Sequence, residues 1–256
     1  MKIGISSPAF ALEPFSKTFD AVAEKFEFWE IVADLEQLLP DIADELKVRA
    51  PSYNIKFSVH APFNDLNIAA LNPQLRKLAV DYVKNTIKTA ADLDISLVSV
   101  HPGHFCPSGI YNTKKVLETN LRSIHEIAKF ANDYSLSLAL ENMPIKNWTL
   151  GNTAEEILNM INDTKLGICF DIGHAFIQNE VENFLKHVDR IYNVHIHDND
   201  GRRDQHLILG EGAIDIPQII KTLNNNYNGN IIIESNTLEE GVKSKEFLQS
   251  IIDKIR

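Results

Sequence analysis

The sequence is poor in cysteine and has no long hydrophobic run. Two of its 256 residues are cysteines, Cys106 and Cys169, and they lie far apart with no CxxC motif. This argues against a disulfide framework and a zinc ribbon, and it is typical of a reducing cytoplasm. The first residues, MKIGISSPAF, lack the apolar core of a signal peptide, and no run of about 18 apolar residues occurs. We therefore expect a cytoplasmic protein without a membrane partner.

Basic residues are also scarce. The chain has 35 acidic and 25 basic residues, which gives a formal net charge of -10. A protein that binds nucleic acid by electrostatics alone is normally basic, so the charge argues against DNA or RNA as a partner. Bound divalent metals would weaken this objection, because they reverse the local field of the carboxylates.

The chain lacks linkers, low-complexity tracts and abrupt changes of composition, so we expect one domain over residues 1–256. Short apolar runs instead alternate with segments that carry apolar residues at three- and four-residue spacing. The runs predict eight strands: Lys2–Ser7, Phe26–Val32, Ile55–His60, Leu97–His101, Leu136–Glu141, Leu166–Asp171, Ile191–His197 and Ile231–Glu234. The clearest helical segments are Leu75–Leu93, Thr113–Tyr134, Thr153–Ile161 and Val242–Ile255.

This alternation predicts an α/β protein with a parallel sheet covered by helices. Eight units indicate a (β/α)8 TIM barrel. A doubly wound open sheet is the alternative. It is less favoured because no glycine-rich phosphate fingerprint follows the first strand, where the chain reads SSPAFALEP.

Candidate metal ligands stand where the predicted strands end. They are His60, His101, Glu141, Asp171, His174, His195 and Glu234. Taken singly, such a histidine is more often structural, and such a carboxylate often caps the next helix. However, no lysine or arginine stands at these ends, and unpaired buried carboxylates are costly. Because the strand ends of a barrel converge on one face, the pattern predicts a divalent metal site there.

The segment NVHIHDNDGRRDQH, residues 193–206, adds further candidates. Alternation along a strand sends His195 and His197 to the same side, and spacing alone does not choose between them. Beyond Gly201, Asp204 and His206 lie on one side of an extended segment and could hold one ion together with His174. Imidazole and carboxylate ligands suit zinc, manganese or iron better than calcium.

Seven segments resemble the landmarks of the endonuclease IV family (AP endonuclease family 2), within the xylose-isomerase-like TIM-barrel superfamily. In order, they are FSVHAPFNDLNIAA, SLVSVHPGH, LALEN, GICFDIGHAF, NVHIHDND, DQHLILGEG and IIIES. The resemblance implies a metal-dependent hydrolase that cuts phosphodiesters, with abasic-site DNA as the substrate and DNA repair as the role.

The resemblance also implies a ligand set for two or three zinc ions per chain, with Mn²⁺ or Fe²⁺ as alternatives. The first ion would be held by His60 and His101, with Glu141 bridging to the second; the second by Asp171, His195 and Glu234; the third by His174, Asp204 and His206. Glu141 and Glu234 would be the catalytic carboxylates, with Glu234 orienting or deprotonating the attacking water. His197 falls at a position that the family does not use as a ligand.

The substrate-reading segments depart from the family pattern. Where the family has an aromatic and basic segment after the second strand (F-x-K-x-x-R-x-W), this chain reads WEIVADLEQLLP. The family's tyrosine after H-A-P is Phe63 here, and Glu30 looks like the strand-two glutamate of sugar isomerases and epimerases. Arg202 and Arg203 could clamp a phosphate, although a solvated turn explains them equally well.

The runner-up function is therefore a divalent-metal-dependent isomerase or epimerase of a sugar or sugar phosphate. It would use one ion on Glu141, Asp171, His195 and Glu234, and it ranks second because it leaves His60, His101, Asp204 and His206 without a role. A metal-binding module without catalysis is the third candidate. Trp148 is expected to pack, although it follows the fifth strand and could line the cavity mouth. We expect a monomer.

Overall fold

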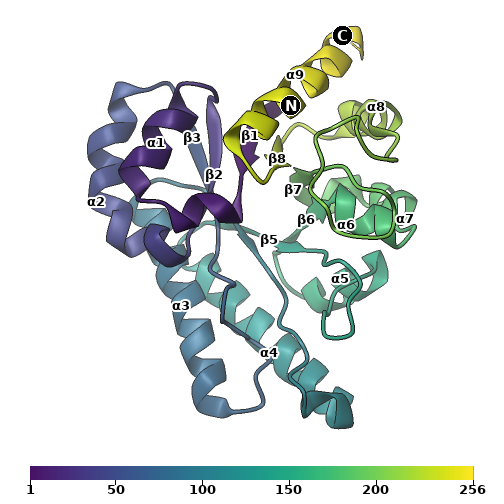
Figure 1. Cartoon of the computed structure of the whole chain (residues 1–256). Coiled ribbons are helices and arrows are strands. Elements are labelled where there is room, and N and C mark those ends of the chain that lie inside the picture. The colour runs from purple at the N-terminus through teal and green to yellow at the C-terminus, as the bar shows by residue number, and fades with distance from the viewer. Residues whose placement is uncertain (256) are drawn as a thin grey trace.

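Eight parallel strands form a closed barrel at the centre of the molecule (Figure 1). The computed structural model describes residues 1–255. The strands are β1 (Lys2–Ser6), β2 (Phe28–Val32), β3 (Lys56–His60), β4 (Leu97–Val100), β5 (Ser137–Glu141), β6 (Gly167–Asp171), β7 (Ile191–Ile196) and β8 (Asn230–Glu234). Each strand pairs with the next in sequence, and β8 pairs with β1 with Asn230 beside Lys2.

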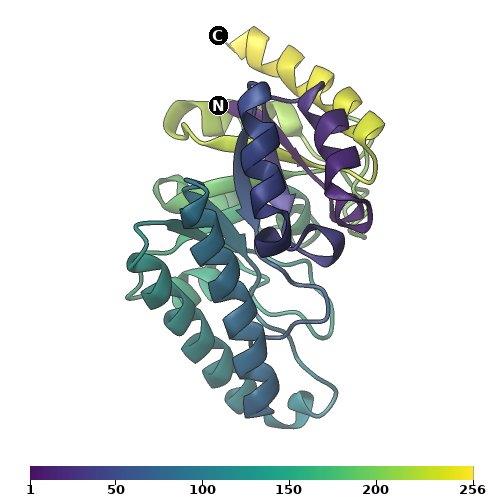
Figure 2. The same ribbon diagram turned by 90° about the vertical axis from the view of Figure 1, so that its left-hand side faces the viewer.

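Helices cover the outside of the barrel (Figures 1 and 2). They are α1 (Phe15–Ala23), α2 (Leu39–Arg49), α3 (Pro73–Asp92), α4 (Thr113–Asn132), α5 (Ala154–Ile161), α6 (Ile172–Ile177), α7 (Val181–Leu185), α8 (Ile216–Asn226) and α9 (Leu238–Ile255). The two longest, α3 and α4, lie side by side and extend beyond the barrel. Short 3-10 segments occur at Pro8–Leu12, Leu35–Gln37, Ala50–Ser52, Gly109–Asn112 and Val188–Arg190.

The predicted TIM barrel is confirmed, and the open-sheet alternative is wrong because β8 returns to pair with β1. The predicted strands agree with the observed ones to within two residues at each end. The run Ile191–His197, for example, becomes β7 at Ile191–Ile196. Apolar runs locate buried strands well because both faces of a barrel strand are covered.

Local signals explain where the helices begin. Asn72 accepts hydrogen bonds from the backbone N–H groups of Gln74 and Leu75, and Pro73 occupies the first helical position of α3. Thr153 accepts one from Glu156 N at the start of α5. Such caps satisfy helix N–H groups that have no partner within the helix.

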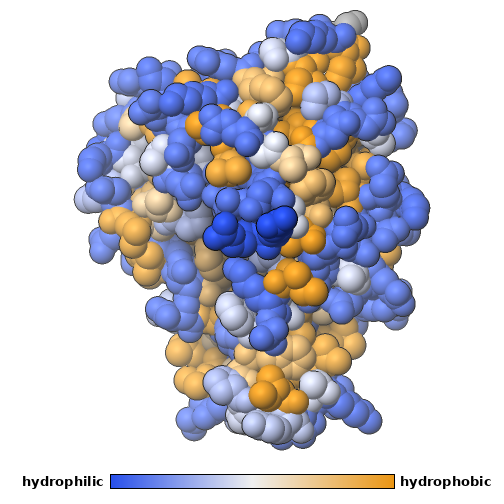
Figure 3. All heavy atoms as spheres, turned by 45° about the vertical axis from the view of Figure 1, so that its right-hand side comes forward, coloured by the Kyte–Doolittle hydropathy of each residue, from blue (hydrophilic) through white to orange (hydrophobic). Residues whose placement is uncertain are grey.

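The core lies between the strands and the helices. Trp29 on β2 has no exposed surface and stacks on Phe15 of α1, with ring centroids 5.7 Å apart. Burying an aromatic side chain of this kind stabilises the fold by roughly 1.5–3 kcal/mol. Figure 3 shows a largely hydrophilic surface with apolar patches scattered over this face of the molecule. Among residues 1–255, no helix has the length and apolar character needed to cross a membrane.

Candidate metal centre

The nine predicted ligands lie together around one cavity of about 420 Å³ at the carboxyl ends of the strands. Glu141, Asp171 and Glu234 are the last residues of their strands. A parallel barrel places all its strand ends on one face, so these carboxylates converge there. Seven of the nine line the cavity: His60, His101, Glu141, His174, Asp204, His206 and Glu234. Asp171 and His195 lie deeper and have no exposed surface.

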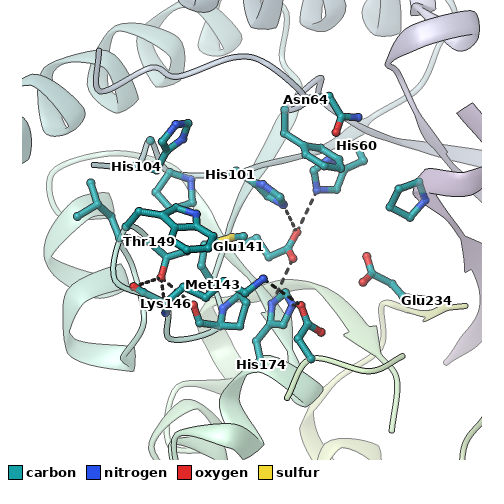
Figure 4. A pocket seen from close by; sticks show the side chains of 18 of the residues that line it. His60, Asn64, His101, His104, Glu141, Met143, Lys146, Thr149, His174 and Glu234 are labelled. Atoms are coloured by element: carbon teal, nitrogen blue, oxygen red, sulfur yellow. Dashed lines mark hydrogen bonds and ion pairs between the residues drawn. The ribbon is translucent and has the colours of Figure 1, made fainter. Parts of the chain in front are cut away.

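The first cluster consists of His60, His101 and Glu141. His60 Nε2 lies 3.0 Å from Glu141 Oε2, and His101 Nε2 lies 3.4 Å from the same oxygen. Figure 4 shows both rings directed at this carboxylate. The Phe63 ring packs beside both histidines, with centroids 5.0 Å from His60 and 4.6 Å from His101. Phe63 therefore lines the cavity next to the cluster, and its contact with substrate stays a prediction.

The second cluster shares Glu141 with the first and adds Asp171, His195 and Glu234. His195 Nδ1 lies 3.0 Å from Glu234 Oε1 and 3.3 Å from Glu141 Oε2. The four potential ligand atoms are within 4.8 Å of one another. Glu141 thus stands between two groups of ligands, as a bridging carboxylate would.

The third cluster contains His174, Asp204 and His206. His174 Nε2 lies 3.4 Å from Asp204 Oδ2, and His206 Nε2 lies 3.1 Å from Asp204 Oδ1. His174 comes from α6, whereas the other two come from the loop between β7 and α8. His197 belongs to this cluster as well.

The outward nitrogens of three histidines make hydrogen bonds that set their tautomers. His60 Nδ1 donates to the Ala61 carbonyl oxygen at 2.8 Å, and His174 Nδ1 donates to the Asn142 carbonyl oxygen at 2.9 Å. His195 Nε2 donates to the Glu30 carboxylate at 2.6 Å. Each bond leaves the other nitrogen free to point a lone pair into the cluster, which is how histidine ligands are oriented in metal sites.

The cluster fits divalent ions because several inward atoms are buried without a hydrogen-bond partner among the described residues. These atoms are Asp171 Oδ2, His195 Nδ1, His197 Nε2 and Asp204 Oδ1. Leaving such atoms unpaired is costly, and a metal ion would satisfy them.

The pKa values of the cluster residues are shifted because buried histidines and carboxylates lie close together. Burial would lower the pKa of His174, but Asp171 and Asp204 raise it to about 10. Burial would raise the pKa of Glu141, but His195 and His101 lower it well below its usual range. Without an ion, His174 and His195 thus act as positive partners of the carboxylates.

Glu30 lies beneath this centre rather than in the cavity. Its side chain has no exposed surface and accepts hydrogen bonds from His195 Nε2, from Ser58 Oγ at 2.7 Å and from Asn193 Nδ2 at 2.7 Å. Burial would raise the pKa of Glu30, but the charge of His195 and its hydrogen bond lower it. The expected substrate contact of Glu30 does not match this position; its carboxylate orients His195 instead.

Arg202 and Arg203 lie in an exposed turn. Their backbone N–H groups donate to Asp200 Oδ1 at 2.9 and 3.1 Å, and neither side chain is among the described residues that line the cavity. The expected phosphate clamp is therefore not formed in this structure, whereas the solvated turn is.

Two residues of the site were not singled out from the sequence. Lys146, in the loop after β5, lines the cavity with its Nζ 3.9 Å from Asp204 Oδ2. It lies near the Trp148 ring, which also lines the cavity and is 53% exposed, so Trp148 is at the mouth rather than in the core. Lys146 has no signal in the sequence beyond its place after a strand, whereas the position of Trp148 after the fifth strand already indicates that it could line the mouth.

The second unexpected residue is Asp198, which follows β7. Its buried carboxylate accepts four backbone N–H groups, from Asn199 at 2.9 Å, Gly210 at 2.9 Å, Gly212 at 3.0 Å and Ile214 at 3.2 Å. These bonds tie both ends of the loop that carries Asp204 and His206. Asp198 therefore acts on the third cluster by holding its loop.

Known proteins share this architecture over nearly the whole chain. An uncharacterised protein of Methanocaldococcus jannaschii is 36% identical over 99% of this chain and 90% of its own length. A solved structure described as a D-tagatose 3-epimerase-like protein is 35% identical, with a TM-score of 0.92, over 100% of this chain and 98% of that one.

A probable endonuclease 4 of Aquifex aeolicus is 26% identical over 87% of this chain and 86% of its own length. The chain is thus similar both to an endonuclease and to an epimerase-like protein. The profile of the xylose isomerase-like TIM barrel family matches residues 19–251. The chain belongs to the xylose isomerase-like TIM barrel family.

Proposed function

We propose that the protein is a metal-dependent phosphodiester hydrolase, related to endonuclease IV, whose site holds two or three ions, mainly zinc. The observation that carries this proposal is the number of ligand clusters. One four-ligand cluster would be enough for an isomerase, but two further histidine-containing clusters adjoin it. Clusters that share Glu141 suit a pair of ions acting on one phosphate.

Bound metals would supply charge stabilisation for the phosphoryl group and would lower the pKa of a bound water. The chain itself contributes Glu234. Burial would raise the pKa of this carboxyl, but His195 lowers it to about 2, so it is ionised at neutral pH. Because Glu234 lines the cavity, it can accept a hydrogen bond from the attacking water and orient it toward phosphorus. The water oxygen bonds to phosphorus as one P–O ester bond breaks, giving a phosphomonoester and an alcohol.

The rim of the cavity favours a substrate smaller than duplex DNA. Lys146 offers a positive charge for a phosphate, and the exposed Trp148 ring offers a surface on which a base or sugar can stack. The segment after β2 folds back onto the protein: Asp34 accepts the backbone N–H groups of Phe63 and Asn64, and Gln37 donates to the Phe10 carbonyl oxygen. It does not project as a DNA-probing loop.

The test is an assay of zinc- or manganese-loaded protein on bis(p-nitrophenyl) phosphate and on short single-stranded oligonucleotides. We expect hydrolysis that chelators abolish and that Glu234→Gln lowers by about 100-fold or more. Glu239→Gln, in the exposed first turn of α9, is the matched control and should retain activity. Hydrolysis absent from the loaded protein would overturn the proposal.

An epimerase is the second candidate. It is favoured by the four-residue cluster of Glu141, Asp171, His195 and Glu234, in which two glutamates stand near one potential metal position. One carboxylate could remove the proton next to a ketose carbonyl while the other returns it to the opposite face. The resemblance to the epimerase-like structure supports this option. Interconversion of ketohexoses epimeric at C3, with a single ion per chain, would establish it in place of the hydrolase.

A further inference from the structure

His197 is a buried histidine beside the cavity that neither proposed chemistry uses. It follows β7, has no exposed surface, and its Nε2 has no hydrogen-bond partner among the described residues. We propose that His197 is a fourth protein ligand of the third metal site, together with His174, Asp204 and His206. This inference rests on the proposed metal centre and deepens it.

The argument begins with the direction of the ring. His197 Nε2 lies 3.4 Å from Asp204 Oδ1 and 3.4 Å from Asp171 Oδ1, while Nδ1 faces the Asp198 carbonyl oxygen at 3.4 Å. An Nδ1–H tautomer satisfies that carbonyl and leaves the Nε2 lone pair facing two carboxylates. Such a nitrogen is repelled by its surroundings unless a cation lies between them.

Asp204 is the point on which the cluster converges. The Nε2 atoms of three histidines approach its carboxylate, His206 at 3.1 Å and both His174 and His197 at 3.4 Å. The potential ligand atoms of all four residues lie within 4.8 Å of one another. Three imidazoles and one carboxylate around a common centre make up a complete set for tetrahedral zinc.

The chain makes room for this ring at Gly173. A Cβ atom at position 173 would lie 2.1 Å from His197 Cε1 and 2.3 Å from its Nε2, so no other residue fits there without displacing the ring. The ring also stacks on His206, with centroids 4.0 Å apart and planes at 15°. Two imidazoles in a parallel stack cannot both point Nε2 at one ion, so zinc binding turns the His206 ring out of this stack. The burial of His197 excludes a role as a direct substrate contact.

A four-ligand site has a different use from a three-ligand one. Structural zinc sites are closed by four protein ligands, whereas catalytic ones keep a position for water or substrate. With His197 included, the third ion would tie the loop of Asp204 and His206 to α6 and β7. The chemistry would then be left to the two clusters that share Glu141.

The decisive experiment is crystallography of zinc-loaded protein with anomalous data at the zinc edge. We expect an ion at the third cluster with His197 Nε2 at a coordination distance of about 2.0–2.1 Å. An ion held there by His174, Asp204, His206 and a water, with His197 beyond bonding distance, would overturn this inference and leave the proposed function intact. An empty third cluster beside occupied first and second clusters would overturn the inference too and would reduce the proposed centre to two ions.

A second measurement does not depend on crystals. Zinc retained against a competing chelator should fall by about one ion per chain in His197→Ala, with that ion's affinity at least about 100-fold weaker, because even removing a residue that orients a ligand costs 10–100-fold. His197→Asn keeps a polar group in the same space and serves if the alanine variant does not fold. His187→Ala, outside the cavity, is the control and should retain every ion. Unchanged zinc affinity in a folded His197 variant would overturn the inference.

Discussion

The carboxylate of Glu30 on β2 accepts a 2.6 Å hydrogen bond from Nε2 of His195 on β7, at a depth where neither side chain is exposed. The bond crosses the interior of the barrel and fixes which nitrogen of His195 faces the cavity. A carboxylate behind a histidine also makes that histidine a stronger metal ligand.

The Glu30→Gln variant tests this relationship. We expect metal affinity at the second cluster to fall by about 10–100-fold, because glutamine is a weaker acceptor and its amide cannot hold the tautomer as firmly. Competition with a chelator under defined zinc or manganese would measure the change. Glu36→Gln, exposed in the 3-10 segment that follows β2, is the control. Equal affinities in the two variants would show that Glu30 serves packing alone.

Asp198→Asn should weaken both the fold and the third cluster. An amide at this place loses the charge and presents an NH₂ group to backbone N–H donors, so we expect a loss of about 3 kcal/mol in the free energy of unfolding. Urea denaturation of the zinc-free proteins would measure it. Asp200→Asn lies on the same loop with an exposed side chain, and its stability should stay close to wild type. A similar small loss in both variants would contradict the role given to Asp198.

Removal of metal should lower the melting temperature. A ligand at 100 times its dissociation constant stabilises the native state by about 2.7 kcal/mol, which corresponds to roughly 5–10 °C for a chain of this size. Thermal unfolding before and after chelation, and again after zinc is restored, would show the shift. A melting temperature that chelation and zinc leave unchanged would contradict a metal centre.

Zinc affinity should rise with pH between 6 and 8. Burial opposes protonation of His174, but Asp171 and Asp204 raise its pKa to about 10, so the metal-free side chain carries a proton throughout this range. Zinc must displace that proton, and each displaced proton makes the affinity about tenfold higher per pH unit. Calorimetry in two buffers of different ionisation enthalpy would count the protons released. Zinc binding without proton release would contradict the expected direction.

Duplex DNA with an abasic site should be a poor substrate compared with small phosphodiesters. The segment after β2 is held against the barrel by Asp34 and Gln37, so nothing from it reaches a groove. Incubation of nanomolar metal-loaded protein with abasic and intact duplexes would measure cleavage. Rapid chelator-sensitive cutting of the abasic strand would show that other surface residues read the DNA.

The sequence was most informative where one periodicity determines the structure. The apolar runs located the strands because each is buried on both faces, and parallel strands then bring Glu141, Asp171 and Glu234 to one end of the barrel. The other candidates at the strand ends lie with them for the same reason, and Asp204 and His206 join them from the loop after β7. Their binding of metal remains a prediction.

The remaining features depend on contacts between segments that are far apart. Glu30 and His195 are 165 positions apart in the sequence, so the location of Glu30 on β2 did not predict their hydrogen bond. The four donors to Asp198 come from a loop with no periodic pattern, and Lys146 enters the cavity from another. The position of His197 depends on the absence of a side chain at Gly173.

The four hydrogen bonds to Asp198 have a consequence for metal selectivity. Because backbone donors already hold the loop of Asp204 and His206, the ion does not have to order the loop when it binds. A loop held in this way also has little room to widen around a larger cation that needs six to eight oxygen ligands, such as calcium. We therefore expect the proposed third site to discriminate against calcium, because the backbone bonds to Asp198 fix its loop before an ion binds.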